Sequence, residues 1–289
     1  MDTEIIFVKT RWFYQSYIDF YKLVDLSGFK TIYVDELDTS KDGIYITTPM
    51  NGEWRPHLEN QWDKERNAHL ILWNLERPTG SAGYSGEYSQ KQRRLMYGQH
   101  DDGSPAKCRF IDEVWVSDRQ MAAESGMRFV VLGSDEGLGE PDDTQKKVYD
   151  FCHFSYDEVN RRRNIYRRFD KVAPNAWPPE RDIILKQSKF ALNIHQDNHP
   201  FQEPLRFALF AAYGIPIITE TIFDSYPWSD EYMVYSTWDD IVRKVREILS
   251  EPYDRFKEMG LRSRERMCHE FQFGKMVRQA VEESVGSWR

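Results

Sequence analysis

The chain has 289 residues, 40% hydrophobic and 15% aromatic, so it is long enough for two domains that each bury a core. Its formal net charge of −8 argues against a protein whose main role is to coat nucleic acid, and its composition excludes a fibrous or disordered chain. The three cysteines, Cys108, Cys152 and Cys268, are widely spaced and indicate neither a zinc site nor a disulfide framework. The first residues lack a signal-peptide pattern, and no apolar run reaches membrane-spanning length. We therefore expect a cytoplasmic protein without membrane insertion.

Short apolar runs alternate with segments of helical periodicity along the first half of the chain. We expect strands over residues 4–8, 30–34, 43–48, 68–75, 113–117 and 129–132. The segment 12–27 has helical spacing, and Gly28 is placed to end that helix. Buried strands that alternate with helices predict a mostly parallel, doubly wound sheet.

The polar segment 140–147 contains no apolar side chain except that of its proline, and it is our predicted domain boundary. It separates an N-terminal, acceptor-side Rossmann-like domain, residues 1–141, from a C-terminal donor domain, residues 146–289. Further strands are expected over 148–155, 171–173, 190–194, 215–219 and 233–235. A long amphipathic segment, 253–285, closes the chain with helices. The predicted fold class is α/β, with two doubly wound Rossmann-like domains facing a cleft.

Residues 190–220 form the most informative stretch, because strand, polar loop, helix and strand follow one another as a βαβ unit. Pro204 lies at the start of the predicted helix and Gly214 lies just past its end, which is the usual punctuation of a helix. Such units bind ligands at the carboxyl ends of their strands. The polar clusters at 195–203 and 219–221 follow strand ends, so we expect a ligand site there.

His195, Asp197 and His199 alternate along the polar loop, as metal ligands on one face of a strand would. Asn198 and Pro200 indicate instead that the strand has already ended, and we expect no metal site. Two interpretations of His195 stay open: it binds a ligand from the strand end, or neighbouring backbone satisfies it.

Glu203 and Arg206 bracket the start of the same helix, where free N–H groups and the helix dipole favour a phosphate. Arg206 offers a bidentate cation for phosphate, and Glu203 can accept hydrogen bonds from hydroxyl groups. The alternative is a capping carboxylate beside a solvated arginine. Glu220 either receives a ribose or sugar hydroxyl or caps the next turn.

Arginines gather just after the strand at 148–155. Arg161, Arg162 and Arg163 open a helix where a diphosphate would lie, whereas Arg167 and Arg168 are expected to be solvated. The same arginines are the main candidates for binding a nucleic-acid backbone. The alternative is that they form an exposed helix face without a ligand.

In the first half, Glu76 ends an apolar strand and is the better candidate for a general base than the trio at 100–102. A salt bridge with Arg66 or Arg77 is the alternative for Glu76. The sequence contains no Gly-x-Gly-x-x-Gly after a strand, no phosphate-binding P-loop and no nucleophile elbow. These absences argue against a dinucleotide-dependent oxidoreductase, a P-loop enzyme and an enzyme with a Ser/His/Asp triad.

The chain resembles the GT-B glycosyltransferases, most closely the short forms related to CgeB-like and group 1 transferases. Four stretches carry the resemblance: VYDFCHFSYDEVNRRRNIYRRF, WPPERDIILKQSKFALNIHQ, EPLRFALFAAYGIPIITE, and the pair DEVWVSD and FVVLG. The resemblance covers residues 110–285, and the first hundred residues resemble the family only in architecture.

The resemblance implies that a nucleotide-diphosphate sugar is the donor, with no obligatory cofactor or metal. The resemblance also implies a set of donor-binding residues: Arg161, Arg162, Arg163, Trp177, His195, Glu203, Arg206 and Glu220. The candidate catalytic residues are Glu76, as a base, and His195. One departure concerns Leu209, which stands where many group 1 members carry a glutamate that grips the ribose.

We therefore expect a hexosyl- or pentosyltransferase that moves a sugar to a hydroxyl acceptor. On the resemblance, the acceptor is a glycan, a small molecule or a hydroxymethylated DNA base, the last as in phage enzymes that modify DNA. The alternative is a non-catalytic GT-B module that binds a nucleotide sugar or a partner.

Overall fold

The computed structural model describes residues 4–11, 17–48, 66–75, 111–155, 160–195, 202–222 and 224–288. The chain splits into two compact units, Met1–Val130 and Val131–Arg289. This division comes earlier in the chain than the polar segment 140–147. The reason is that Ser134 bonds within the second unit: its N–H donates to the Met267 carbonyl over 3.1 Å, and its Oγ donates to the Ala208 carbonyl over 2.9 Å.

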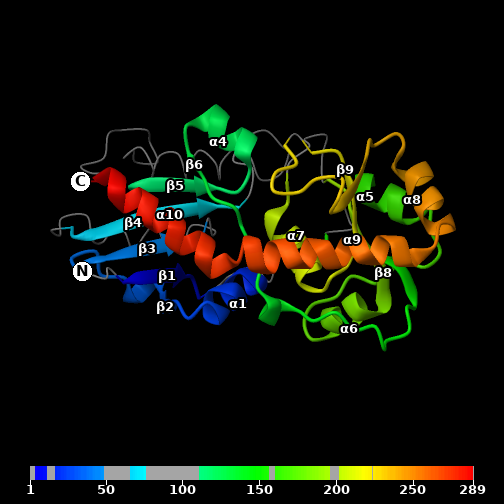
Figure 1. The fold of residues 1–289 in the computed structure, drawn as a ribbon. Helices are drawn as coiled ribbons and strands as arrows, with labels where there is room; N and C mark the ends of the chain where they lie inside the picture. Colours follow the sequence, from blue (N-terminus) through cyan, green and yellow to red (C-terminus); the bar gives the residue numbers. More distant parts are fainter. Residues whose placement is uncertain are drawn as a thin grey trace. The chain divides into compact units, whose positions relative to one another are not determined.

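The first unit contains a six-stranded sheet in the order β2-β1-β3-β4-β5-β6, in which every pair is parallel. Its strands are β1 (Ile5–Lys9), β2 (Lys30–Tyr33), β3 (Gly43–Thr47), β4 (Ala68–Asn74), β5 (Glu113–Val116) and β6 (Arg128–Phe129). Its helices include α1 (Ile18–Leu26), a 3₁₀ turn (Val34–Glu36) and α4 (Arg119–Ser125) (Figure 1). Phe20, Trp73 and Trp115 pack edge to face in its core. The chain runs from β1 out to β2 and then back past β1 to β3, which confirms the doubly wound pattern predicted for this half.

The second unit contains a four-stranded parallel sheet in the order β10-β9-β8-β7. The strands are β7 (Tyr149–Cys152), β8 (Ser188–Asn193), β9 (Ile217–Glu220) and β10 (Met233–Ser236). Phe151 of β7 also forms an isolated parallel bridge to Val172, on the side away from β8. The chain therefore leaves β7 toward one side and returns as β8 on the other. This reversal makes the carboxyl end of β7 a topological switch point, where open α/β sheets bind ligands.

Helices cover both faces of the second sheet. They include α5 (Asn160–Tyr166), α6 (Glu180–Gln187), α7 (Pro204–Ala212), α8 (Ile241–Ser250) and α9 (Tyr253–Glu265) (Figure 1). The unit also contains a 3₁₀ turn (Glu136–Leu138) before the sheet and, after α9, a π-helical turn (Arg266–Glu270) and α10 (Phe273–Trp288). Ile165 of α5, Val245 of α8 and Phe256 of α9 share one core with Phe190 and Leu192 of β8. Because successive strand residues point to opposite faces, Ala191 and Asn193 of β8 point away from that core.

Helix α7 has the limits that the sequence predicts. Pro204 occupies its first turn, where a missing N–H costs nothing, and Gly214 follows it with φ +63°. The Gly214 N–H donates to the Ala211 carbonyl over 2.8 Å, and the Ile215 N–H donates to the Phe210 carbonyl over 3.1 Å. These two bonds form a Schellman motif, which ends the helix and turns the chain into β9.

Two further expectations concern thiols and membranes. Cys152 and Cys268 are buried free thiols, and Cys108 lies outside the described residues. None of the helices in the described parts of the chain is both long enough and apolar enough to cross a bilayer.

Candidate functional site

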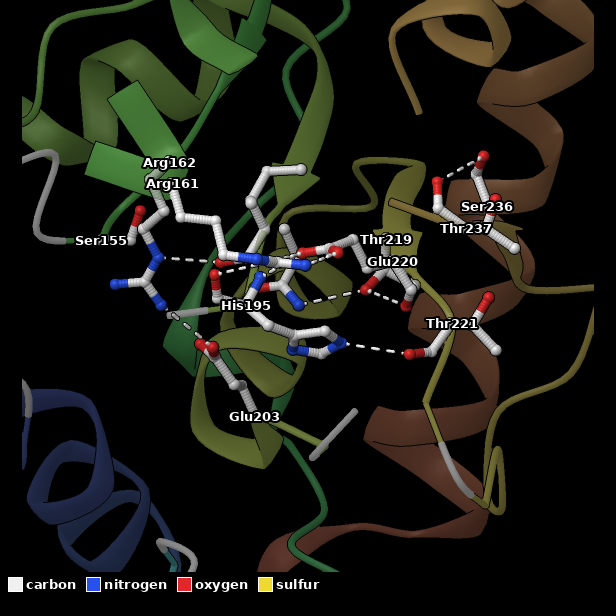
Figure 2. Close-up of polar contacts among 12 residues, drawn as sticks. Ser155, Arg161, Arg162, His195, Glu203, Thr219, Glu220, Thr221, Ser236 and Thr237 are labelled. Carbon is white, nitrogen blue, oxygen red and sulfur yellow. Dashed lines mark hydrogen bonds and ion pairs between the residues drawn. The ribbon is translucent and has the colours of Figure 1, made fainter. Parts of the chain in front are cut away.

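Polar side chains of the second unit converge where its strands end. The parallel register sets Asn193 opposite Thr219, and just past this pair the His195 N–H donates to Glu220 Oε2 over 2.7 Å. Helix α7 begins at Pro204, after β8, and α5 follows β7. Figure 2 shows the side chains of Arg161, His195 and Glu220 meeting at this edge. The two predicted clusters, at 195–203 and 219–221, thus share one site.

Arg161 and Glu220 form a bidentate ion pair across this edge. Arg161 Nη1 donates to Glu220 Oε2 over 2.5 Å, and Nη2 donates to Oε1 over 2.6 Å. The Glu220 side chain is only 4% exposed and that of Arg161 is 15% exposed. The Arg161 guanidinium also lies 3.8 Å from the ring centroid of Trp238, which follows β10. The pair therefore links α5 to the ends of β9 and β10.

A second chain of contacts joins Arg162, Glu203 and Arg206. Arg162 Nη2 donates to Glu203 Oε1 over 3.2 Å, and Arg206 pairs with the other oxygen of the same carboxylate. Arg206 Nη1 also donates to Asn193 Oδ1 over 2.5 Å, and Asn193 Nδ2 donates to Thr219 Oγ1 over 3.0 Å. Burial, and next the nearby Arg162 charge, lower the pKa of Arg206 to about 9, which leaves the guanidinium charged at neutral pH.

His195 lies buried between these two groups of contacts. Its Nε2 is 3.2 Å from the carbonyl oxygen of Thr221, an atom that only accepts hydrogen bonds, so Nε2 carries the proton. Burial lowers the pKa of His195 from 6.5, although the Glu220 carboxylate partly opposes that shift. At neutral pH the imidazole is therefore uncharged, and Nδ1 is a hydrogen-bond acceptor.

The lowered pKa of His195 predicts an acid-dependent loss of stability. Below pH 6.5 the unfolded chain binds a proton at His195 that the folded chain resists, so the free energy of unfolding falls as the pH falls through the lowered pKa. We expect His195→Gln to flatten the decrease in stability between pH 7 and pH 5, as measured by urea denaturation. The matched control is His269→Gln, because the His269 side chain is 48% exposed. Equal slopes in wild type and His195→Gln would contradict the assignment.

The structure brings six of the predicted site residues together. They are Arg161, Arg162, His195, Glu203, Arg206 and Glu220. Arg163 lies on the same helix but takes part in none of the contacts described above. Trp177 lies half-buried before α6, where its carbonyl accepts the Arg181 N–H. Arg167 and Arg168 are exposed, as predicted.

Several candidates fall outside the described residues. They are Glu76, Arg77, Asp197, His199 and the trio at 100–102. Within the ranges that the structure describes, no group of three or more His, Cys, Asp or Glu side chains is placed to hold a metal ion. Leu209 is 2% exposed on α7, so a glutamate at this position would have to be buried.

Four residues of the network were not named individually from the sequence, although Thr219 and Thr221 belong to the predicted cluster 219–221. The four are Asn193, Thr219, Thr221 and Trp238. All four lie at or just after the carboxyl ends of β8, β9 and β10. Glu220 was selected because α/β sheets bind ligands at the carboxyl ends of their strands. The same rule applies to these four residues, since all parallel strands of the sheet end at the same edge.

Among the side chains that the structure describes in this network, cations outnumber carboxylates. Its described members include the guanidinium groups of Arg161, Arg162 and Arg206 against the carboxylates of Glu203 and Glu220, which leaves one positive charge in excess. The Arg206 side chain is 17% exposed and lies in the first turn of α7. A partly buried excess cation beside a helix N-terminus is suited to an anionic ligand.

Comparisons with known proteins concern the family and the fold of this chain. The family model described as "Glycosyl transferase-like" matches residues 119–282. The structure resembles HepE of Anabaena, solved with UDP and glucose, at 8% identity and a TM-score of 0.64 over 99% of this chain and 100% of that one. It resembles the glycosyltransferase AviGT4, of avilamycin A biosynthesis, at 11% identity and a TM-score of 0.51 over 97% and 96% of the two chains.

A third solved structure, TarM, is 10% identical with a TM-score of 0.57, and the matched part covers 91% of this chain but 57% of TarM. No curated protein matches the sequence. The family match spans more than half of the chain, and the two parallel α/β units have the architecture of these solved structures. The chain therefore belongs to the glycosyl transferase-like family and has the GT-B fold.

Proposed function

We propose that the protein transfers a sugar from a nucleotide-diphosphate sugar to a hydroxyl acceptor, and that the donor binds at the strand ends of the second unit. The observation that carries this proposal is the excess positive charge of the network around Arg206. A diphosphate would offset that charge, and its oxygens would match the planar donors of a guanidinium.

Arg206 and the first turn of α7 are the proposed contacts of the diphosphate. The first N–H groups of a helix have no partner within the helix, and the dipole makes this end positive. When the bond between sugar and diphosphate breaks, negative charge grows on the leaving diphosphate. Arg206 and the helix end would stabilise that charge, so the proposal requires no metal ion.

His195 and Glu203 are the proposed contacts of the sugar. Neutral His195 accepts a hydrogen bond at Nδ1, which suits a sugar hydroxyl and not a phosphate oxygen. Glu203 keeps 19% of its side chain exposed beside Arg206 and can accept from a second hydroxyl. Glu76 as the base of an inverting reaction stays a prediction.

The finer identity of the substrates also stays a prediction. HepE was solved with UDP and glucose, which supports a nucleotide sugar and hexosyl transfer over pentosyl transfer. The acceptor is proposed to be a glycan, a small molecule or a hydroxymethylated DNA base, the last as in phage DNA modification. The CgeB-like subtype and a cytoplasmic location also stay predictions.

A non-catalytic module that binds a nucleotide sugar is the second candidate. The observation that favours it is Leu209, which is buried where many group 1 members carry a glutamate. Such a module would bind the donor tightly and leave it intact.

A thermal-shift screen of nucleoside diphosphates and their sugars tests the donor site. A ligand at a hundredfold excess over its Kd stabilises the folded state by roughly 2.7 kcal/mol, which raises the Tm by roughly 5 °C in a chain of this size. We expect one nucleoside diphosphate and its sugar to produce such a shift. If no nucleotide raises the Tm, the proposed donor site is contradicted.

A further inference from the structure

The Arg161–Glu220 ion pair joins α5 to β9, and it also binds backbone atoms of His195. Both oxygens of Glu220 are occupied by Arg161, at 2.5 and 2.6 Å, and the pair is largely buried. The carboxylate is thus satisfied inside the protein. It is better placed to hold protein atoms than to receive a ribose or sugar hydroxyl.

What the pair holds is the backbone of His195. Glu220 Oε2 accepts the His195 N–H over 2.7 Å, and Arg161 Nη1 donates to the His195 carbonyl over 3.0 Å. Both polar groups of this residue's backbone are therefore bound by the two members of one ion pair. A bond from Arg162 Nε to the Ile194 carbonyl, 2.8 Å long, holds the preceding residue in the same way.

The His195 ring is fixed by the segment that follows Glu220. Its Nε2–H donates to the carbonyl of Thr221, the next residue after Glu220. Figure 2 shows the imidazole directed toward Thr221 from the strand end that the ion pair holds. With the backbone and Nε2 both anchored, Nδ1 is left in one orientation as an acceptor.

The anchors of this arrangement come from three separate elements. Arg161 lies in the first turn of α5, Glu220 ends β9, and Trp238 follows β10 and packs against the Arg161 guanidinium at 3.8 Å. A bidentate guanidinium–carboxylate pair has a fixed planar geometry, so it sets direction as well as distance. A lysine at position 161 would keep the charge but lose that geometry.

We propose that Arg161 and Glu220 are positioning residues that hold His195 so that its Nδ1 accepts a hydrogen bond from a hydroxyl of the donor sugar. This assignment rests on the proposed function for its ligand, although the clamp itself is a property of the free protein. On this proposal, His195 recognises the sugar, whereas Arg206 recognises the diphosphate.

Imidazole nitrogen NMR tests the clamp without any ligand. The chain has 7 histidines, and the His195 signals are assigned by their loss in His195→Gln. We expect the Nε2–H form alone in wild type, and both tautomers in Glu220→Gln and in Arg161→Lys. Arg161→Lys keeps a positive charge beside Glu220, so it serves if Glu220→Gln does not fold. An unchanged His195 tautomer in a folded variant overturns the clamp.

Paired binding measurements test the role in sugar recognition. Calorimetry compares the Kd of the nucleotide sugar with that of the same nucleoside diphosphate. We expect Arg161→Lys to weaken the nucleotide sugar about tenfold and the bare diphosphate little, as for loss of one hydrogen bond to the ligand. In the background of His195→Gln, Arg161→Lys should cause no further loss.

The outcomes separate this inference from the proposed function. Equal weakening of both ligands, or an undiminished effect of Arg161→Lys without His195, overturns the positioning role. If wild type binds no nucleotide sugar, the sugar contact fails together with the proposed function, whereas the NMR result still decides whether Arg161 and Glu220 orient His195.

Discussion

Replacing Arg206 with alanine is expected to weaken binding of the nucleotide sugar by about 10- to 100-fold. The estimate corresponds to the loss of a charge-assisted hydrogen bond worth about 1.5–3 kcal/mol. Arg206 is the proposed diphosphate contact because it lies in the first turn of α7 and belongs to a network with excess positive charge. Its removal would leave Arg161 and Arg162 matched by Glu220 and Glu203, so the helix N-terminus would remain as the main attraction for an anion.

Two variants sharpen the Arg206 prediction. Arg206→Lys keeps the charge but loses the planar donors, and we expect an intermediate Kd. Arg168→Ala is the matched control, because Arg168 is an exposed arginine of the same unit outside the network. Calorimetry measures all three, with urea denaturation to verify folding. A folded Arg206→Ala variant with the wild-type Kd would contradict the assignment of the diphosphate.

Gly260→Ala is expected to destabilise the protein by about 3 kcal/mol, although alanine favours helix. Gly260 lies in α9 against the turn that joins α7 to β9, and a Cβ there would lie 2.2 Å from the Gly214 carbonyl oxygen and 2.7 Å from the Pro216 nitrogen. Backbone atoms cannot move aside as a flexible side chain does. The turn, or α9, must therefore shift.

Gly286→Ala is the matched control, since it makes the same change within a helix. Among the described residues, a Cβ at Gly286 meets no atom within 4 Å, so we expect a gain of about 0.5–1 kcal/mol from helix propensity alone. Urea denaturation of both variants measures the difference. Equal effects of the two substitutions would show that the close packing of Gly260 does not constrain the turn between α7 and β9.

The local elements of the site were predictable from the sequence. Pro204 and Gly214 mark the limits of α7 because each acts on the backbone of its own turn. The apolar runs of β8 and β9 identify them as buried strands for the same local reason. From these elements the rule of strand ends selects His195 and Glu220.

The pairing of charges was not predictable in this way. Arg161 and Glu220 are 59 residues apart, and each was assigned to the ligand because its partner could not be identified from the sequence. The segment 253–285 was expected to close the chain with helices, but the sequence did not show where they separate: a π-helical turn lies between α9 and α10. The Ser134 contacts lie at that turn: its N–H donates to the Met267 carbonyl and its carbonyl accepts the Phe273 N–H, bonds that depend on a distant segment.

The measurement that tests the central claim most directly is hydrolysis of the donor by the purified protein. The nucleotide sugar that raises the Tm most is incubated with wild type and with Arg206→Ala, and the nucleoside diphosphate released is quantified by chromatography. If the protein is a glycosyltransferase whose donor binds at the strand ends of the second unit, wild type should release the nucleoside diphosphate slowly. The Arg206→Ala variant should release none. Tight binding of the donor without any release, with or without candidate acceptors, would contradict catalysis and support the binding module instead.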